Sequence, residues 1–253
     1  VKCVNADLGI EQEKNLAYIA AQKFYDYLSY IPTARPHITI TKNIPQAAGL
    51  GGGSADAAAV LRGLNKLYGE PFTTKKLCEI GLTIGADVPF CIVGGVYICQ
   101  NRGEIGMSIR GIHHYNLLIA KGEEKISTAE QYRRLDEKFN NFVNYHYGIG
   151  FGGTISAYMG MRCRDAFAST KNVFDALYDE KSSVQRIKRI MCECDAYFAF
   201  LSGSGPSVVG VFPDSLYAED AQEILKDLGV DSYMCVPISL EYNEMIEGKE
   251  PWQ

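Results

Sequence analysis

The sequence has no long apolar run and no excess of positive charge, and each absence excludes a class of protein. No apolar stretch approaches the ~18 to 20 residues that cross a bilayer, and the first residues do not resemble a secretory signal peptide. The formal net charge over 253 residues is −5, so the chain lacks the basic surface that binds nucleic acid or anionic membranes. We therefore expect neither nucleic acid nor membrane as a partner.

The eight cysteines and four histidines form no metal-binding motif. There is no CxxC pair and no HExxH, and the closest pair, Cys192 and Cys194, has no second pair at zinc-site spacing. Several cysteines lie in apolar runs such as VPFCIVGGVYIC. We expect buried free thiols in a reducing cytoplasm and assign no metal ligand.

The stretch from Gly49 to Gly53 is almost entirely glycine, and a helical pattern follows it. A helix N-terminus leaves N–H groups unpaired and carries partial positive charge, so it favours an anion, and glycines let the backbone approach that anion closely. Ser54 would be the N-cap. The pattern predicts a phosphate-binding loop, although glycine runs also form flexible surface turns. The apolar positions of the following helix are Ala57, Leu61 and Leu64, with Leu67 or Tyr68.

Two common phosphate-binding motifs are excluded for this loop. No lysine follows the glycines, so GxxxxGK[ST] is absent, and Ser54 occupies the place of the third glycine of GxGxxG.

The remaining patterns alternate between helix and strand. Further predicted elements are a helix over 15–28, a strand over 37–43, a helix after Thr73 or Thr74 that ends by Gly85, an apolar strand after Asp87, a strand over 116–120, a helix from 127 capped by Ser127 or Thr128 with Glu130 completing a capping box, a strand, glycine turn and strand over 196–214, a helix over 218–229 and a final strand.

Three segments of this chain, taken together, resemble the GHMP small-molecule kinases. PQAAGLGGGSADAAAVL is similar to their second motif, and LSGSGPSVVGVF is similar to their third. GLTIGADVPFCIVGG resembles the segment specific to the branch that phosphorylates 4-diphosphocytidyl-2-C-methyl-D-erythritol. Order and spacing match over most of the chain.

The resemblance implies a fold, an activity and cofactors. It implies an α+β fold, with an N-terminal domain like domain 2 of ribosomal protein S5 over residues 1–112, a ferredoxin-like C-terminal domain over 113–253, and an active site in the cleft between them. The implied reaction transfers the γ-phosphate of ATP, with Mg²⁺ as counterion, to the 2-hydroxyl of the cytidine-diphosphate-linked polyol in non-mevalonate isoprenoid biosynthesis. We expect a monomer or homodimer.

Asp87 falls on the catalytic aspartate of the family. It would accept the proton of the attacking hydroxyl, and its place between a glycine turn and an apolar segment predicts partial burial that increases its basicity. Taken without the resemblance, it is equally an aspartate that shapes a turn.

The other implied site residues divide between ATP and substrate. Each has an alternative interpretation. Lys42 would be a solvated lysine at a strand end, Thr128 would cap a helix, and Gly203 and Gly205 would shape a tight turn without contacting a ligand. Asp56 stays unassigned, because a carboxylate beside phosphate is repulsive unless Mg²⁺ intervenes. The expected ATP-binding residues are Lys42, Gly49, Leu50, Gly51, Gly52, Gly53 and Ser54, and the expected substrate-binding residues are Thr128, Gly203 and Gly205.

Two features depart from the family. Its first motif, which carries a catalytic lysine, and the following GYH that helps to hold cytosine have no counterpart here, and we expect them to precede Val1. The glycine- and aromatic-rich stretch 145–162 and the acidic tail have no assigned role. The alternatives are another GHMP kinase such as homoserine kinase, or a catalytically silent nucleotide-binding protein.

Overall fold

The computed structural model describes residues 1–5, 7, 9–30, 36–100, 105–109, 115–124, 126–139 and 171–237. The stretch 145–162 and the acidic tail therefore lie outside the described residues. The described chain forms two compact units, the first from residues before 47 and from 51 to 109, the second from 47–50 and 115–237. The glycine loop thus contributes to both units. The predicted domain boundary near residue 112 stays a prediction.

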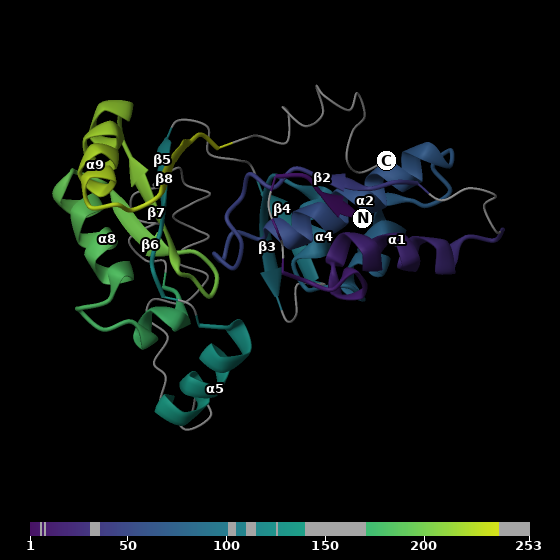
Figure 1. The fold of residues 1–253 in the computed structure, drawn as a ribbon, viewed down its shortest axis with the longest axis horizontal. Coiled ribbons are helices and arrows are strands. Elements are labelled where there is room, and N and C mark those ends of the chain that lie inside the picture. Colours follow the sequence, from purple (N-terminus) through teal and green to yellow (C-terminus); the bar gives the residue numbers. More distant parts are fainter. Residues whose placement is uncertain are drawn as a thin grey trace. The chain divides into compact units, whose positions relative to one another are not determined.

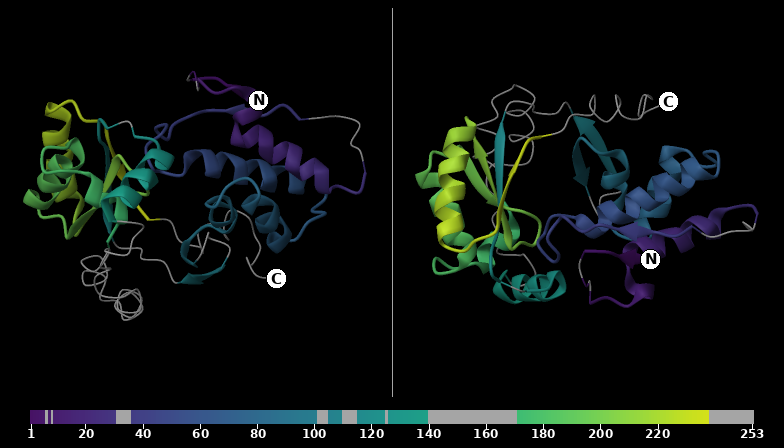
Figure 2. Two further views of the ribbon diagram at one scale, coloured as in Figure 1. Left: turned by 90° about the horizontal axis from the view of Figure 1, so that it is seen from below. Right: turned by 45° about the horizontal axis from the view of Figure 1, so that its top comes forward.

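The first unit is mainly helical. Its core lies between α1, α2, α3 and α4, with α1 beside α2 (Figures 1 and 2). The Asn15 side chain caps α1 by accepting a hydrogen bond from Ala17 N at 2.9 Å. The elements are β1 (Lys2–Cys3), η1 (Gln12–Lys14), α1 (Leu16–Tyr27), β2 (Thr39–Ile40), α2 (Gly52–Leu67), α3 (Thr74–Leu82), α4 (Val88–Val93), β3 (Val96–Gln100) and β4 (Ile105–Ile109).

Helix α2 follows the predicted apolar pattern. Ala57, Leu61 and Leu64 are buried, and of the two alternatives for the last position it is Tyr68 that packs, stacking on Phe24 with ring centroids 6.0 Å apart, while Leu67 is 66% exposed. The N-cap is Gly51 in the left-handed region, so the prediction of Ser54 as N-cap is wrong. Ser54 lies in the first turn, because the helix begins as soon as the left-handed glycine has turned the chain.

The apolar segment after Asp87 is a helix, so the predicted strand is wrong. Pro89 lies in the first turn of α4, where its fixed φ suits a helix and its missing N–H costs nothing. Gly94, with φ of 75°, ends the helix. The following residues form the antiparallel β3–β4 hairpin, in which Val96 pairs with Ile109.

The second unit contains a four-stranded sheet in the order β6-β7-β5-β8, and every neighbouring pair is antiparallel. Helices α8 and α9 cover one face (Figures 1 and 2), where Ile187 and Leu225 pack over Leu118. The βαββαβ order is that of the expected ferredoxin-like domain. The elements are β5 (Asn116–Lys121), α5 (Thr128–Phe139), η2 (Val173–Leu177), α8 (Ser183–Glu193), β6 (Phe198–Leu201), β7 (Ser207–Phe212), α9 (Ser215–Asp227) and β8 (Ser232–Cys235).

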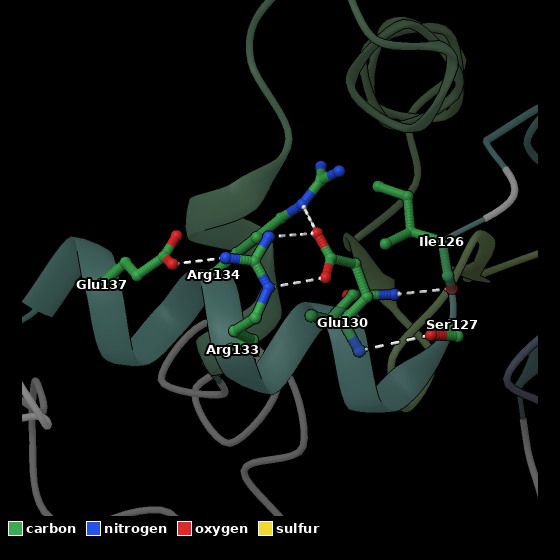
Figure 3. Close-up of polar contacts among 7 residues, drawn as sticks. Ile126, Ser127, Glu130, Arg133, Arg134 and Glu137 are labelled. Atoms are coloured by element: carbon green, nitrogen blue, oxygen red, sulfur yellow. Dashed lines mark hydrogen bonds and ion pairs between the residues drawn. The ribbon is translucent and has the colours of Figure 1, made fainter.

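Helix α5 carries an exposed cluster of charges (Figure 3). The Glu130 carboxylate accepts hydrogen bonds from Arg133 at 2.7 Å and Arg134 at 2.8 Å, which lower its pKa to about 2. Of the predicted capping box, the bond from Glu130 N to Ser127 Oγ is present, while the Glu130 carboxylate binds the two arginines. Exposed pairs of this kind add little stability, so the packing of the buried Leu135 in the core does more to hold α5 in place.

The seven described cysteines are free thiols, but Cys99 and Cys192 are exposed and the others are only half-buried. The expectation of buried thiols is therefore wrong for those two. Cys78 is the most protected chemically, since burial raises its pKa to about 11. Within the described residues, no helix is both long and apolar enough to span a bilayer.

We predict that Leu61→Ala destabilises the first unit by about 2 to 5 kcal/mol, because Leu61 is completely buried in the helical core. Leu67→Ala, on the same helix but exposed, should change stability by less than about 0.5 kcal/mol. Urea denaturation followed by far-UV circular dichroism measures both variants. Equal losses would mean that α2 does not bury the face described here.

Candidate active site

The N-terminus of α2 presents backbone N–H groups without intrahelical partners. The first backbone hydrogen bond of the helix runs from Ala55 N to Gly51 O at 2.9 Å, so the N–H groups of residues 52–54 lie before the ladder begins. A Cβ added at Gly51 would have nothing within 4 Å. The loop therefore offers donors, the positive end of a helix dipole and open space, which together suit a phosphate.

Lys42 lies beside this helix N-terminus. Its Nζ is 2.6 Å from Asp56 Oδ2 and 3.0 Å from the position that a Cβ on Gly52 would take. The Lys42 side chain is only 10% exposed, so the alternative of a solvated lysine at a strand end is wrong. Asn5 fixes its backbone, since Lys42 N donates to Asn5 Oδ1 at 2.6 Å and Asn5 Nδ2 donates to Lys42 O at 3.0 Å.

The start of the glycine loop is fixed within the second unit. Gly49 has φ of 72°, and a Cβ there would lie 2.2 Å from Ser202 O and 2.9 Å from Gly205 N. Ser202 Oγ donates to Gly49 O at 2.9 Å, and Ser207 N donates to Ala48 O at 3.3 Å. Only glycine allows this approach, so Gly49 is required for packing as much as for turning.

The glycine turn from Ser202 to Pro206 is in turn held by side chains of its own unit. Asn172 Nδ2 donates to Leu201 O at 2.9 Å and to Gly203 O at 2.7 Å. Gly203 and Gly205 both have positive φ, as a tight turn requires. The turn is therefore rigid on the side that faces Gly49.

Thr128 lies at the other side of the same turn. Its Oγ1 is 2.8 Å from Ser204 Oγ, and the pair is exposed. Ser127, not Thr128, caps α5, because Glu130 N donates to Ser127 Oγ at 3.2 Å (Figure 3). The capping alternative for Thr128 is wrong, and its hydroxyl is directed to Ser204 instead.

Asp87 is the N-cap residue of α4, but its side chain makes no capping hydrogen bond. It is exposed, so the predicted partial burial is wrong. Its negative charge acts on neighbouring thiols: burial first and Asp87 second raise the pKa of Cys91. The chain thus leaves this carboxylate accessible, while Lys42 pairs with Asp56 and Gly49 contacts Ser202.

Comparison with known proteins finds family models that match an N-terminal and a C-terminal part of the chain. The family model of the GHMP kinases N terminal domain matches residues 15–95, and that of the GHMP kinases C terminal domain matches residues 148–231. The chain belongs to the GHMP kinases.

The curated relatives extend this membership over almost the whole chain. A 4-diphosphocytidyl-2-C-methyl-D-erythritol kinase of Clostridium novyi is 35% identical over 92% of this chain and 81% of its own length. A protein of the same name from Clostridium perfringens (strain ATCC 13124 / DSM 756 / JCM 1290 / NCIMB 6125 / NCTC 8237 / Type A) is 40% identical over 85% of this chain and 72% of its own.

Solved structures show the same fold. The crystal structure of a 4-(cytidine 5'-diphospho)-2C-methyl-D-erythritol kinase has a TM-score of 0.71 at 23% identity, covering 93% of this chain and 81% of that one. The Methanococcus jannaschii mevalonate kinase has a TM-score of 0.70 at 16% identity, covering 88% and 75%. The α+β GHMP kinase fold expected from the sequence is confirmed.

Several residues around this GHMP kinase site had no sequence signal strong enough to assign them. Asp56 sits near the start of α2, and only its charge, 14 residues after that of Lys42, would have indicated the pair. Asn5 and Asn172 bind backbone groups and Ser204 contacts a hydroxyl 76 residues away, and such partners cannot be read from spacing. The roles of the predicted ATP- and substrate-binding residues stay predictions.

We predict that Gly49→Ala destabilises the protein more than Gly51→Ala. Both substitutions place a side chain in the left-handed region, at about 1 to 2 kcal/mol, but only the Cβ at 49 collides with the backbone of Ser202, at about 1 to 3 kcal/mol more. Urea denaturation compares the two. A larger loss for Gly51→Ala would contradict the packing role of Gly49.

Proposed function

We propose that this GHMP kinase transfers the γ-phosphate of ATP to the 2-hydroxyl of 4-diphosphocytidyl-2-C-methyl-D-erythritol. The observation that carries the proposal is the 35% identity over 92% of the chain with a kinase of that name. The segment GADVPFCIVGG, which resembles the one specific to this branch, contains the whole of α4, with Asp87 at its N-cap. ADP and the 2-phosphate would be the products, within isoprenoid biosynthesis.

The residues at the N-terminus of α2 fit an ATP phosphate. The N–H groups of residues 52–54 would donate to phosphate oxygens, and Lys42 would add a charged donor while retaining Asp56, since an ammonium has three N–H groups. The nucleotide would supply a γ-phosphoryl group that reacts once it is aligned and neutralised. The protein's contribution is therefore position and charge.

Mg²⁺ would bind mainly through the nucleotide. Among the described residues, no group of three or more acidic, histidine or cysteine side chains is arranged to hold a metal ion. Mg²⁺ often takes one or two carboxylates together with substrate phosphates, and Asp56 in the first turns of α2 and the exposed Asp87 are the candidates for this role. We also propose a reducing cytoplasmic location, which the exposed free thiols of Cys99 and Cys192 favour.

Asp87 would accept the proton of the attacking hydroxyl. Its carboxylate is exposed and not committed to its own helix, so an incoming hydroxyl can reach it. Removing this proton as the phosphorus–oxygen bond forms makes the hydroxyl a better nucleophile. Thr128 and Ser204 would hydrogen-bond the polyol hydroxyls.

An ADP-release assay tests the proposal. The full-length protein is given ATP and Mg²⁺ with 4-diphosphocytidyl-2-C-methyl-D-erythritol, homoserine or mevalonate. Turnover with the cytidyl substrate alone is expected. Turnover with homoserine alone would reassign the substrate, and ATP binding without any turnover would favour a silent nucleotide-binding protein.

We predict that Lys42→Met raises the Kd for ATP about 10- to 150-fold, because a charged donor beside the helix N-terminus is lost. Asp56→Asn should instead lower stability, since it leaves a mostly buried ammonium without its partner, and the double variant should recover part of that loss. Calorimetric titration measures the Kd for ATP of Lys42→Met, and urea denaturation measures the stability of Asp56→Asn and of the variant that carries both substitutions. Lys76→Met, which removes an exposed lysine of α3, is the control. An unchanged Kd in Lys42→Met would remove Lys42 from the ATP site.

For Asp87→Asn we expect turnover to fall by a factor of about 10² or more, with the Kd for ATP little changed, because the substitution removes a base and not a phosphate ligand. Steady-state kinetics and nucleotide titration separate the two. Glu79→Gln removes an exposed carboxylate of α3 and should leave turnover as it is. A folded Asp87→Asn enzyme with normal turnover would exclude Asp87 as the base.

A further inference from the structure

Gln131 is a buried amide that hydrogen-bonds both the segment before its own helix and the turn that contains Ser204. It is 1% exposed, and its Nε2 donates to Ser204 O at 2.5 Å and more weakly to Ile126 O at 3.4 Å. Among the described residues, its Oε1 has no hydrogen-bond partner. An unpaired buried acceptor opposes folding, so stability alone does not account for a glutamine at this position.

A second donor reaches the same carbonyl. Tyr178 Oη donates to Ser204 O at 3.0 Å, and burial is the main reason why the pKa of Tyr178 is raised, which keeps the hydroxyl protonated as a donor. The Ser204 carbonyl is therefore held from α5 by Gln131 and from the end of η2 by Tyr178. Two buried donors on one turn carbonyl fix the direction of that peptide.

The Ser204 side chain contacts Thr128, with 2.8 Å between the two hydroxyl oxygens. Thr128 and Gln131 lie three residues apart on α5, so one helix turn carries both the exposed hydroxyl and the buried amide. Each hydroxyl can donate and accept, which suits the hydroxyls of a polyol chain.

We propose that Gln131 is a positioning residue of the kinase reaction, which orients the Ser202–Pro206 turn so that Ser204 and Thr128 present a hydroxyl pair to the polyol substrate. Ser204 is then a substrate-binding residue in addition to Thr128. This inference rests on the proposed function. Tyr178, which binds the same Ser204 carbonyl, has the same positioning role.

The ATP side of the turn depends on different bonds. Gly49 O accepts from Ser202 Oγ, and Ala48 O accepts from Ser207 N, so neither contact includes Gln131. Loss of Gln131 should therefore affect polyol binding more than ATP binding. This asymmetry distinguishes a positioning role from general loosening of the fold.

The test compares Gln131→Leu and Tyr178→Phe with the wild type in steady-state kinetics. In each variant we expect the KM for the polyol substrate to rise about tenfold, with the KM for ATP changed less than about twofold and kcat changed less than about threefold. Because Gln131→Leu removes an unpaired buried acceptor, the variant should fold. An unchanged polyol KM in both variants would overturn the proposal.

Asn65→Leu is the matched control. Asn65 is also a buried amide, and it holds both backbone groups of Phe72 in the first unit. The variant should be less stable, with both KM values unchanged. If the polyol KM rises equally in Asn65→Leu, general destabilisation explains the result of Gln131→Leu, and the proposal is overturned.

Hydrogen exchange tests the turn without any turnover. In Gln131→Leu we expect the Gly205 amide, which donates to Ser202 O at 2.8 Å, to exchange about tenfold faster than in the wild type. Asn65→Leu should not change it. If the wild type fails to phosphorylate the cytidyl substrate, the proposed function fails, yet exchange still reports whether Gln131 holds the turn. An unchanged exchange rate of the Gly205 amide in Gln131→Leu would overturn the claim that Gln131 orients the turn.

Discussion

The close approach of Gly49 to the Ser202–Gly205 turn is the constraint on which the rest of the site depends. A side chain at 49 would meet a backbone oxygen at 2.2 Å, so the chain can enter the glycine loop only with glycine there. Two residues later Gly51 turns the backbone into α2. One short segment thus belongs to the second unit at its start and forms a helix N-terminus of the first unit at its end.

Charge at this helix N-terminus is balanced before any nucleotide binds. Lys42 and Asp56 form a close pair that is largely shielded from water, and Asn5 fixes the lysine backbone. A buried ammonium without a partner would be costly, whereas an ammonium that keeps one carboxylate still has N–H groups for a phosphate. Asp56, which looks repulsive toward phosphate from its position alone, instead holds the lysine beside the loop.

Much of the fold could be predicted because the relevant signals are local. The apolar spacing of Ala57, Leu61 and Leu64 fixed a helix face, and the strands and helices after residue 115 follow local patterns, whereas the ferredoxin-like order was expected from the resemblance to the GHMP kinases. The errors came where two local signals compete. VPFCIV reads as a strand by apolarity, but a proline in the first turn and a glycine at the end make it α4. Ser54 is a good N-cap by type, but Gly51 had already started the helix.

The site was predictable in its glycines and charged residues but not in the contacts that position them. Nothing in the sequence places Asn172 or Gln131 on carbonyls of a turn some thirty or seventy residues away in the chain, because such bonds depend on the tertiary fold. Asp87 was expected to be partly buried only because the next segment was read as a strand; at the N-cap of a short helix it is exposed.

The central claim is that the N-terminus of α2, with Lys42, binds the phosphates of ATP. A crystal structure of the full-length protein with a non-hydrolysable ATP analogue and Mg²⁺ tests it most directly. The account predicts phosphate oxygens within hydrogen-bonding distance of the amides of residues 52–54 and of Lys42 Nζ, with the Lys42–Asp56 pair retained. Phosphates bound elsewhere, with these amides still open to solvent, would contradict it.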